Sequence, residues 1–163
     1  MERGFEKISF NQFGSDVCCD KKLYDGYELP KRASKFSCGY DFISFRDIVI
    51  KPGQIVKIPT GYKAKMLSDE VLLLVVRSSM GFKYNVRLCN QVGVIDSDYY
   101  NNSDNEGHIY VALQNEGKDD FYIKKGDAYC QGIFMKYLTC GDSVSDVRVS
   151  GIGSTNSLDE EGD

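Results

Sequence analysis

The feature of this chain that most constrains its fold is a series of short apolar runs, rich in β-branched residues and separated by turn signals. The first run ends at a turn over 51–53 and the second at a turn over 59–61, both containing Pro and Gly. Many short strands at close spacing, with helical periodicity nearly absent, predict an all-β barrel or sandwich. The runs cover residues 47–50, 54–58, 71–76, 86–88, 93–95, 108–113, 121–123 and 129–135.

The run Val71 to Val76 is the most apolar of the series and does not alternate with polar residues. A strand covered on both faces has this pattern, and so does a short buried helix. We expect the strand, at the centre of a sheet. The segment Tyr100 to Gly107 is instead dense in turn-forming residues, which predicts an exposed hairpin extension.

Length and pattern together predict one folded domain followed by a tail. A chain of 163 residues can bury roughly 70% of its unfolded surface, which is enough for an ordinary core. From about residue 141 the apolar pattern gives way to Gly, Ser and Asp. We expect a β-domain over 1–140 and a flexible C-terminal arm over 141–163.

Charge and composition exclude several classes of function. The net charge of -4 argues against a surface for nucleic acid or for an anionic membrane, because both need a dense basic patch. No apolar run reaches the length of a membrane span, and the N-terminus lacks the layout of a signal peptide. We expect a cytoplasmic protein. Its six cysteines are scattered, which predicts free thiols, several of them core residues.

A phosphate-binding turn is one interpretation of the segment Arg77 to Gly81, which follows the buried run directly. Arg77, Ser78 and Ser79 offer a guanidinium and two hydroxyls beside backbone N–H groups, and Gly81 lets a ligand approach the backbone. A Ser-Ser pair after a strand is also compatible with a simple helix cap.

The segment Asn90 to Tyr99 is the strongest candidate for chemistry. Its apolar run ends abruptly at Asp96, so a strand delivers a carboxylate to a strand end or tight turn, and Tyr99 follows three residues later. The alternative is a strand with a capping Asp and a surface Tyr.

Three further segments combine small and polar residues. Asp41 follows Gly39 in the segment 37–42, where it could equally close a strand at a turn. Gln131 ends the segment 128–131. The segment 148–155 joins Arg148 to a Gly- and Ser-rich stretch whose backbone could approach phosphate, although a disordered tail has the same composition.

Taken in order, these five segments resemble the five sequence motifs of the trimeric dUTP pyrophosphatases, the dUTPases. The first motif has a Gly, an aromatic residue and an Asp; the second is Arg-Ser-Ser-x-Gly; the third holds an Asp and a Tyr. The fourth ends in Ala-Gln, and the fifth is a Gly-rich arm. Together they span Cys38 to Thr155, most of the chain.

The resemblance implies a role for each motif residue. Asp96 would activate the attacking water, and Tyr99 would pack on the deoxyribose and leave no room for a 2′-hydroxyl. Asn90 and Gly93 would read the uracil edge, in a pocket to which Ile95 also belongs. The phosphates would be bound by Arg77, Ser78, Ser79, Gly81, Gln131 and Arg148, and the arm residues Ile152, Gly153, Ser154 and Thr155 would close over the nucleotide.

It also implies an all-β, jelly-roll-like distorted barrel that assembles as a homotrimer and hydrolyses dUTP to dUMP and pyrophosphate with Mg²⁺. Asp41 would order water around the magnesium. Each site would take its hairpin from one subunit, its phosphate groups from a second and its arm from a third.

The chain departs from the family pattern at four positions. Cys130 replaces the Ala of the fourth motif, which is a small change. In the fifth motif Ser150 and Asn156 each replace a Gly, and Ile152 replaces the aromatic residue that stacks on uracil. Loss of that stack should weaken closure of the arm, by up to about 1 to 3 kcal/mol.

Two other functions are compatible with these residues. A dCTP deaminase has the same fold but relies on a Glu in the strand after the hairpin, where this chain has Gln114. A second alternative is a binding protein that uses a dUTPase body to engage a regulatory partner through the 100–107 loop, as some bacteriophage members of the family do.

Overall fold

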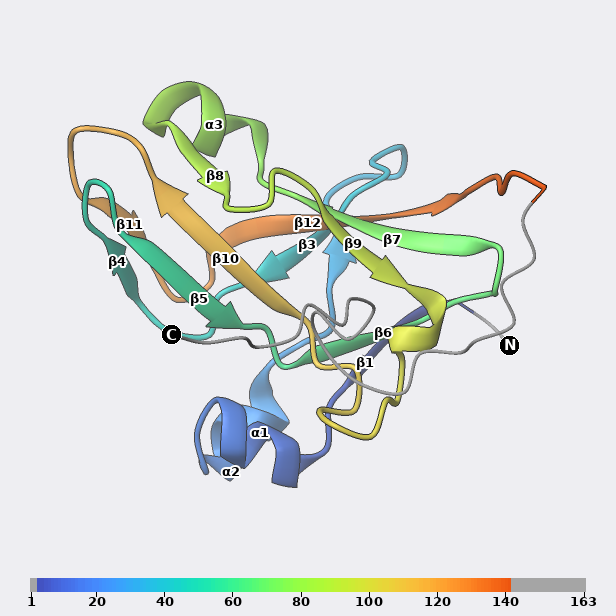
Figure 1. Cartoon of the computed structure of the whole chain (residues 1–163). Helices are drawn as coiled ribbons and strands as arrows, with labels where there is room; N and C mark the ends of the chain where they lie inside the picture. The colour runs from blue at the N-terminus through green and yellow to red at the C-terminus, as the bar shows by residue number, and fades with distance from the viewer. Residues whose placement is uncertain (1–2, 142–163) are drawn as a thin grey trace, which may run out of the picture.

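Antiparallel strands in open layers form the body of the protein, and three short helices lie at its ends (Figure 1). The structure, a computed structural model, describes residues 3–141. The strands are β1 (Gly4–Lys7), β2 (Lys31–Arg32), β3 (Tyr40–Ile43), β4 (Ile48–Ile50), β5 (Ile55–Pro59), β6 (Tyr62–Lys65), β7 (Glu70–Val75), β8 (Val86–Leu88), β9 (Gly93–Asp96), β10 (Tyr110–Asn115), β11 (Phe121–Ile123) and β12 (Ala128–Lys136). The helices are α1 (Phe10–Asp16), α2 (Lys21–Gly26), α3 (Ser78–Tyr84) and the 3-10 turn η1 (Ser97–Tyr99).

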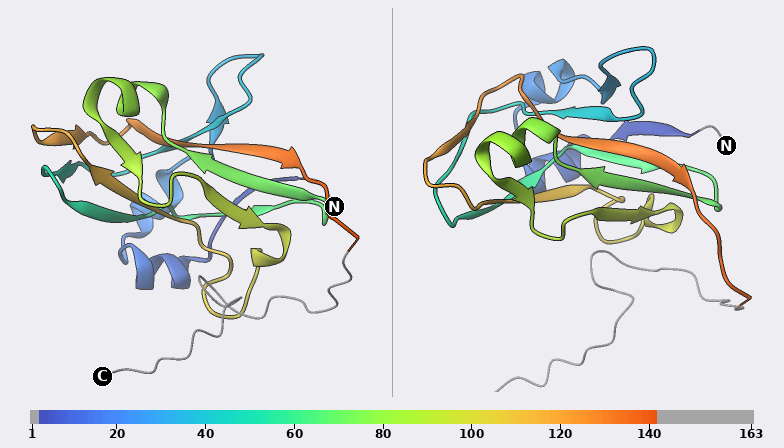
Figure 2. Two further views of the ribbon diagram at one scale, coloured as in Figure 1. Left: turned by 45° about the horizontal axis from the view of Figure 1, so that its top comes forward. Right: turned by 90° about the horizontal axis from the view of Figure 1, so that it is seen from above.

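The largest sheet has the strand order β2-β3-β12-β7-β9, so β7 is an interior strand as predicted. Leu72 and Leu74 of β7 are buried on one face, and Leu73 and Val75 are half-buried on the other. Figure 2 shows β7 and β12 side by side along the molecule, with α3 at one end of the pair. An interior strand with both faces covered explains why this run is continuously apolar.

The remaining strands form smaller sheets, with orders β5-β10-β8, β1-β6 and β11-β4. Within residues 3–141 no sheet closes on itself, so the expected barrel is wrong in that detail and the layers stay open. Turns with positive φ at Gly53 and Gly61 interrupt the ladders on either side of β5, which keeps the sheets short. The all-β, jelly-roll-like architecture itself is confirmed.

The prediction from periodicity missed all three α-helices, because each has only six or seven residues. Two of them begin at side-chain caps. Ser9 Oγ accepts from the Gln12 N–H at 3.1 Å, and the Asp20 carboxylate accepts from the Leu23 N–H at 3.0 Å. In the part of the chain that is described, no helix is long and apolar enough to cross a membrane.

Aromatic rings attach the α1 and α2 region to the sheets. Phe13 of α1 stacks on Tyr27 at 5.4 Å between ring centres, and Tyr27 meets the buried Tyr62 of β6 edge-on at the same separation. Such pairs contribute about 0.5 to 1.5 kcal/mol beyond the area that they bury. The cysteines contribute less to the core than expected, since Cys130 alone is buried among the six.

Glu70 begins β7 and is a buried acid, with 2% of its surface exposed. The guanidinium of Arg3 binds both of its carboxylate oxygens, with 3.0 Å between Arg3 Nε and Glu70 Oε2, and the Leu67 N–H donates to it at 3.1 Å. The hydrogen bond from Arg3 lowers the pKa of Glu70 to about 2, against the opposing effect of burial. The ionised acid therefore ties the N-terminus to the central strand.

We predict that Glu70→Gln lowers the thermal stability at pH 7 but not near pH 2. Because the pKa of Glu70 is lower in the folded state, the unfolded chain binds more protons between about pH 4.5 and 2. The stabilisation is therefore complete above about pH 4.5 and is lost as the pH falls through 2. Melting temperatures of wild type and variant across this range test the prediction, with Asp69→Asn as a control for an exposed ion pair. A difference that does not change with pH would contradict it.

Candidate active site

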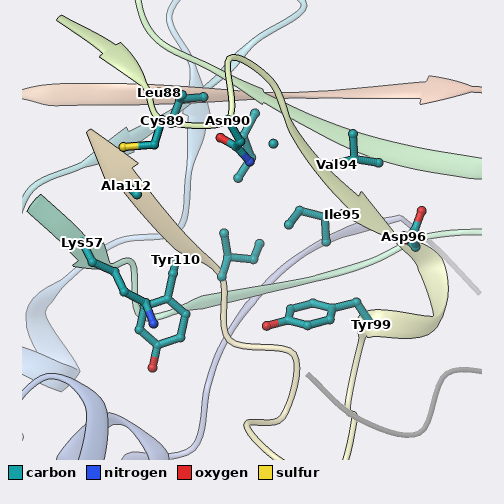
Figure 3. Close-up of a pocket in the computed structure, with 13 residues that line it drawn as sticks. Lys57, Leu88, Cys89, Asn90, Val94, Ile95, Asp96, Tyr99, Tyr110 and Ala112 are labelled. Atoms are coloured by element: carbon teal, nitrogen blue, oxygen red, sulfur yellow. The ribbon is translucent and has the colours of Figure 1, made fainter. Parts of the chain in front are cut away.

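A cavity of about 490 Å³ opens between the segment that runs from β8 to β9 and strand β10, a size that suits a nucleoside. Five of the predicted residues line it: Asn90, Gly93, Ile95, Asp96 and Tyr99. Asn90 lies in the turn after β8, the next three lie in β9, and Tyr99 lies in η1; Figure 3 shows Asn90, Ile95, Asp96 and Tyr99. The structure thus brings the predicted residues of the central motif to one concave site.

Tyr99 forms one wall of this cavity and is not a surface residue. Its ring points into the cavity (Figure 3), and only 6% of the residue is exposed. The phenol donates a hydrogen bond to the His108 carbonyl at 3.0 Å, which holds the far end of the ring. The 3-10 turn η1 begins directly after Asp96, so the three-residue spacing turns the chain and places the ring beside β9.

Asp96 lies at the rim of the cavity. Along β9 the burial alternates, with Gly93 buried, Val94 exposed, Ile95 half-buried and Asp96 exposed. The Asp96 side chain consequently extends from the outward face of β9, and in Figure 3 it points away from the Tyr99 ring.

The opposite wall holds residues that the sequence did not single out. Lys57 of β5 and Tyr110 and Ala112 of β10 line the cavity, and the Lys57 ammonium lies 4.2 Å from the centre of the Tyr110 ring. Such a cation–π contact favours the charged amine at this position. The sequence signal for Lys57 was its position inside the apolar run 54–58. Sequence spacing could not reveal that β5 pairs with β10, which brings Lys57 to the cavity.

His108, the single histidine, is fully buried and lies two residues before β10. Its Nε2 accepts from the Gly61 N–H at 2.9 Å, so its proton is on Nδ1, which donates to Asp16 at 2.6 Å. Burial lowers the pKa of His108, although Asp16 acts in the opposite direction. This neutral imidazole with two hydrogen bonds is a structural residue, and it does not line the cavity.

The second group of predicted residues gathers at the other end of β7. Ser78 and Ser79 form the exposed first turn of α3, and Arg77 occupies the N-cap without a side-chain capping bond. Neither serine therefore serves as the cap. The exposed Gly81 lies in the same helix. Asp41 of β3 faces Gln131 of β12 in register, and its carboxylate lies 3.8 Å from Arg77 Nε.

Gly39 explains how the first and fourth motifs fit together. A Cβ atom at this position would lie 2.2 Å from Oε1 of Gln131, so any larger residue would displace the Gln131 side chain. The Gln131 amide donates to the Val76 carbonyl at 3.5 Å, directly before Arg77. The glycine therefore leaves room for an amide beside the serines.

Asp96 and Arg77 lie far apart within one chain. Val71 of β7 pairs with Asp96 of β9, and Arg77 lies six residues farther along the strand direction. At the rise of a β-strand, Asp96 and Arg77 are separated by about 20 Å. Gly93 is closer to Arg77, because it pairs with Leu74, three residues before it. The acid of the first group and the guanidinium of the second therefore do not meet on one chain.

Part of the predicted site lies outside the described residues. These positions are Arg148, Ser150, Ile152, Gly153, Ser154, Thr155 and Asn156. Within 3–141, no three His, Cys, Asp or Glu side chains are grouped so that they could hold a metal ion by themselves.

The 100–107 loop is less exposed than predicted. Asn102 and Gly107 are buried, and the loop carries side chains that bond to the protein body. Glu106 accepts from the N–H of Ser9 at 2.9 Å, and the Tyr100 hydroxyl donates to Glu6 at 2.7 Å. The loop therefore packs as a part of the domain.

Size alone does not identify the site, because a second cavity of about 800 Å³ lies between α2, β3 and the turn at Lys125. Of the predicted residues it includes Asp41 alone. The smaller cavity is the candidate, since it gathers the complete Asn90 to Tyr99 group.

Comparison with known proteins agrees with this geometry. The dUTPase family model matches residues 25–159. The deoxyuridine 5'-triphosphate nucleotidohydrolase of Lactococcus lactis subsp. lactis is 43% identical over 156 residues, which cover 94% of this chain and 97% of that relative.

Solved structures give the same result. A crystal structure of the dUTPase from Streptococcus mutans matches with a TM-score of 0.68 and 40% identity, covering 85% of this chain and 99% of that one. The dUTPase of phage phi11 of S. aureus, at 18% identity and a TM-score of 0.64 over 90% of this chain and 97% of its own, shares the fold. From the extent of these matches, and from the cavity formed by its central motif, this chain belongs to the dUTPase family.

Proposed function

We propose that this protein is an enzyme that hydrolyses dUTP to dUMP and pyrophosphate. The observation that carries the proposal is the cavity between the β8–β9 segment and β10, which the family motif lines and which has the size of a nucleoside. A nucleotide whose base and sugar occupied this cavity would present its phosphates at the rim, where Asp96 lies. With dUTP as substrate, we expect the enzyme to act in the cytoplasm.

Base and sugar would be recognised by different walls. The Asn90 carboxamide and the backbone near Gly93 can pair with the polar edge of uracil, and a base with another pattern would leave buried polar groups unpaired. The Tyr99 ring, held in the wall, would contact the deoxyribose and exclude a 2′-hydroxyl. Ile95 adds an apolar contact beside the ring.

Asp96 would act as the general base. Its carboxylate would orient a water molecule for in-line attack on the α-phosphorus and accept a proton from it as the new P–O bond forms. The bond to the bridging oxygen breaks, and its electron pair leaves with pyrophosphate. Arg77, Ser78, Ser79 and Gln131 would bind the phosphate oxygens, with Arg148 from the arm.

The described residues offer too few ligands to hold Mg²⁺ by themselves, so the ion would bind together with the triphosphate. Asp41 provides one carboxylate near Gln131 and Arg77, and an ion that keeps most of its water needs few protein ligands. When bound, Mg²⁺ would neutralise phosphate charge. Asp41 would hold its water shell and not the ion itself.

The separation of about 20 Å between Asp96 and Arg77 supports a shared site. We propose a homotrimer in which one subunit supplies the Asn90 to Tyr99 segment, a second supplies Ser78 and Gln131, and a third supplies the C-terminal arm. Isologous or cyclic assembly of identical chains is the usual way to complete such a site.

The two alternatives gain less support. At the position where a deaminase needs a Glu, Gln114 accepts a hydrogen bond from Arg87 at 2.9 Å, and it does not line the cavity. A regulatory partner at the 100–107 loop stays a prediction, but much of the loop's hydrogen-bonding capacity is already used within the chain.

We predict that Asp96→Asn lowers kcat for dUTP by about 100-fold or more, the range for loss of a general base, while dUTP still binds. Pyrophosphate release measures turnover, and calorimetry with dUMP measures binding. Asp98→Asn is the matched control, because this exposed acid lies two residues away outside the cavity lining. Wild-type turnover by the Asp96 variant would refute the assignment.

Mixed assemblies test whether the site is shared. Asp96→Asn and Ser78→Ala subunits, unfolded and refolded together in equal amounts, should recover about a quarter of the wild-type sites, since each residue is intact with a chance of one half. Each variant refolded alone is the control. If both residues acted within one chain, the mixture would have no more activity than its components.

Ile152→Phe should tighten dUTP binding, because it restores a ring that can stack on the base, and stacking contributes about 1 to 3 kcal/mol. Calorimetry with a non-hydrolysable dUTP analogue measures the gain, and Ile152→Leu controls for a change in side-chain shape without a ring. Equal affinity of the Phe and Leu variants would mean that the arm closes through other contacts.

A further inference from the structure

Tyr99 is held at both ends by the loop that follows it, residues 100–107. At the ring end, Asn105 Nδ2 donates to the Tyr99 hydroxyl at 2.9 Å, and this hydroxyl donates to the His108 carbonyl at 3.0 Å. At the backbone end, Asn102 Nδ2 donates to the Tyr99 carbonyl at 2.8 Å. One short loop therefore fixes the main chain of Tyr99 and the tip of its ring.

The two asparagines also bond to each other and to the loop backbone. Asn102 Nδ2 donates to Asn105 Oδ1 at 2.9 Å, and Oδ1 of Asn102 accepts from the N–H groups of Asp104 and Asn105 at 3.0 and 3.2 Å. Asn105 Oδ1 also accepts from the Gly107 N–H at 3.1 Å. Both carboxamides therefore use their oxygen and their N–H groups, which gives the loop one conformation.

Gly107 allows this loop to close on Tyr99. Its φ is +79°, and a Cβ atom there would lie 2.6 Å from the Tyr99 carbonyl oxygen. Only glycine combines this backbone angle with so close an approach. The end of the loop therefore packs directly against the backbone of Tyr99.

The loop is in turn anchored to the domain. Ser9 donates to Glu106 through its N–H at 2.9 Å and through its hydroxyl at 2.5 Å. Lys63 of β6 donates to Asn101 Oδ1 at 2.7 Å. The brace on Tyr99 is therefore connected to β1, α1 and β6 and does not move as a free segment.

We propose that Asn105 is a positioning residue for Tyr99 and that it sets how sharply the site rejects a ribonucleotide. This inference rests on the proposed function. A phenol can donate one hydrogen bond and accept others, and here His108 takes its proton while Asn105 donates to its oxygen. Both bonds together fix the tilt of the ring.

The tilt matters because a 2′-hydroxyl differs from a hydrogen by a single oxygen atom. A ring that can move by part of an ångström makes room for that oxygen, whereas a fixed ring does not. Removal of the Asn105 donor takes one of these two hydrogen bonds from the mostly buried Tyr99 hydroxyl. The expected consequence is weaker discrimination between sugars and not a loss of chemistry.

Asn105→Asp is the sharpest test, since it keeps the shape and the oxygen acceptor for Asn102 and Gly107 and removes the N–H donations to the Tyr99 hydroxyl and the His108 carbonyl. With its single proton, the Tyr99 hydroxyl can then donate to His108 or to the new carboxylate, but it no longer bonds to both. The ratio of kcat/KM for dUTP over UTP should fall about fivefold, the effect of one hydrogen bond, mainly through KM. Ser103→Ala, in the exposed part of the same loop, should keep the wild-type ratio. An unchanged ratio in folded Asn105→Asp would overturn the proposal.

A double-mutant cycle separates positioning from general loss of stability. Tyr99→Phe removes this hydrogen bond together with the one to the His108 carbonyl and should lower the ratio at least as much, and Asn105→Asp should then add little to it. Additive effects would overturn the proposal. If Asn105→Asp does not fold, as judged by thermal unfolding, Tyr99→Phe alone decides, and a wild-type ratio for it would overturn the proposal.

The proposal can fail separately from the function. If the wild-type protein hydrolyses neither nucleotide, the proposed activity is refuted. Calorimetry with dUMP and UMP then measures the same discrimination as a ratio of dissociation constants. A ratio that is equal in wild type and Asn105→Asp would refute the role of Asn105, whereas a lower ratio in the variant would support it.

Discussion

The pairing of β7 with β12 on one side and with β9 on the other is the interaction on which the rest of the structure depends. It fixes the register Gln131 to Val75 and Val71 to Asp96, and so determines where each polar side chain leaves the sheet. A slip by one residue would move every side chain of a strand to the opposite face. The buried Leu72 and Leu74 oppose such a slip, because they would lose their place in the core.

Much of the architecture could be predicted from the sequence, because most of its strands have a recognisable local pattern of apolar and β-branched residues. Eight apolar runs correspond to strands, whereas β1, β2, β3 and β6 were not predicted; β2 has only two residues and β6 reads as Tyr-Lys-Ala-Lys. The helices were missed because a helix of about two turns is too short to show a hydrophobic period. Open sheets instead of a barrel result from which strands pair, and that is not a local property.

The residues of the candidate site likewise fall into two kinds: those that are contiguous in the sequence and could be predicted, and those that come from distant strands and could not. Asn90 to Tyr99 is contiguous, so its motif could be predicted and its residues do line one cavity. Lys57 and Tyr110 come from distant strands and could not be found without the β5–β10 pairing. The Asn105 bond to Tyr99 was hidden for another reason: six residues apart, the two groups meet only because Gly107 and Asn102 close the loop.

Charge affects how a site of this kind would bind its substrate. The protein has a net charge of -4, and its triphosphate substrate is a polyanion, so attraction has to be local. Arg77 lies 3.8 Å from the Asp41 carboxylate, which already balances part of its charge. A triphosphate accompanied by magnesium would offer Arg77 a second anion and Asp41 a hydrated cation. Both groups could then exchange one partner for another without leaving a charge unpaired. Asp96, about 20 Å away on the same chain, lies outside this exchange.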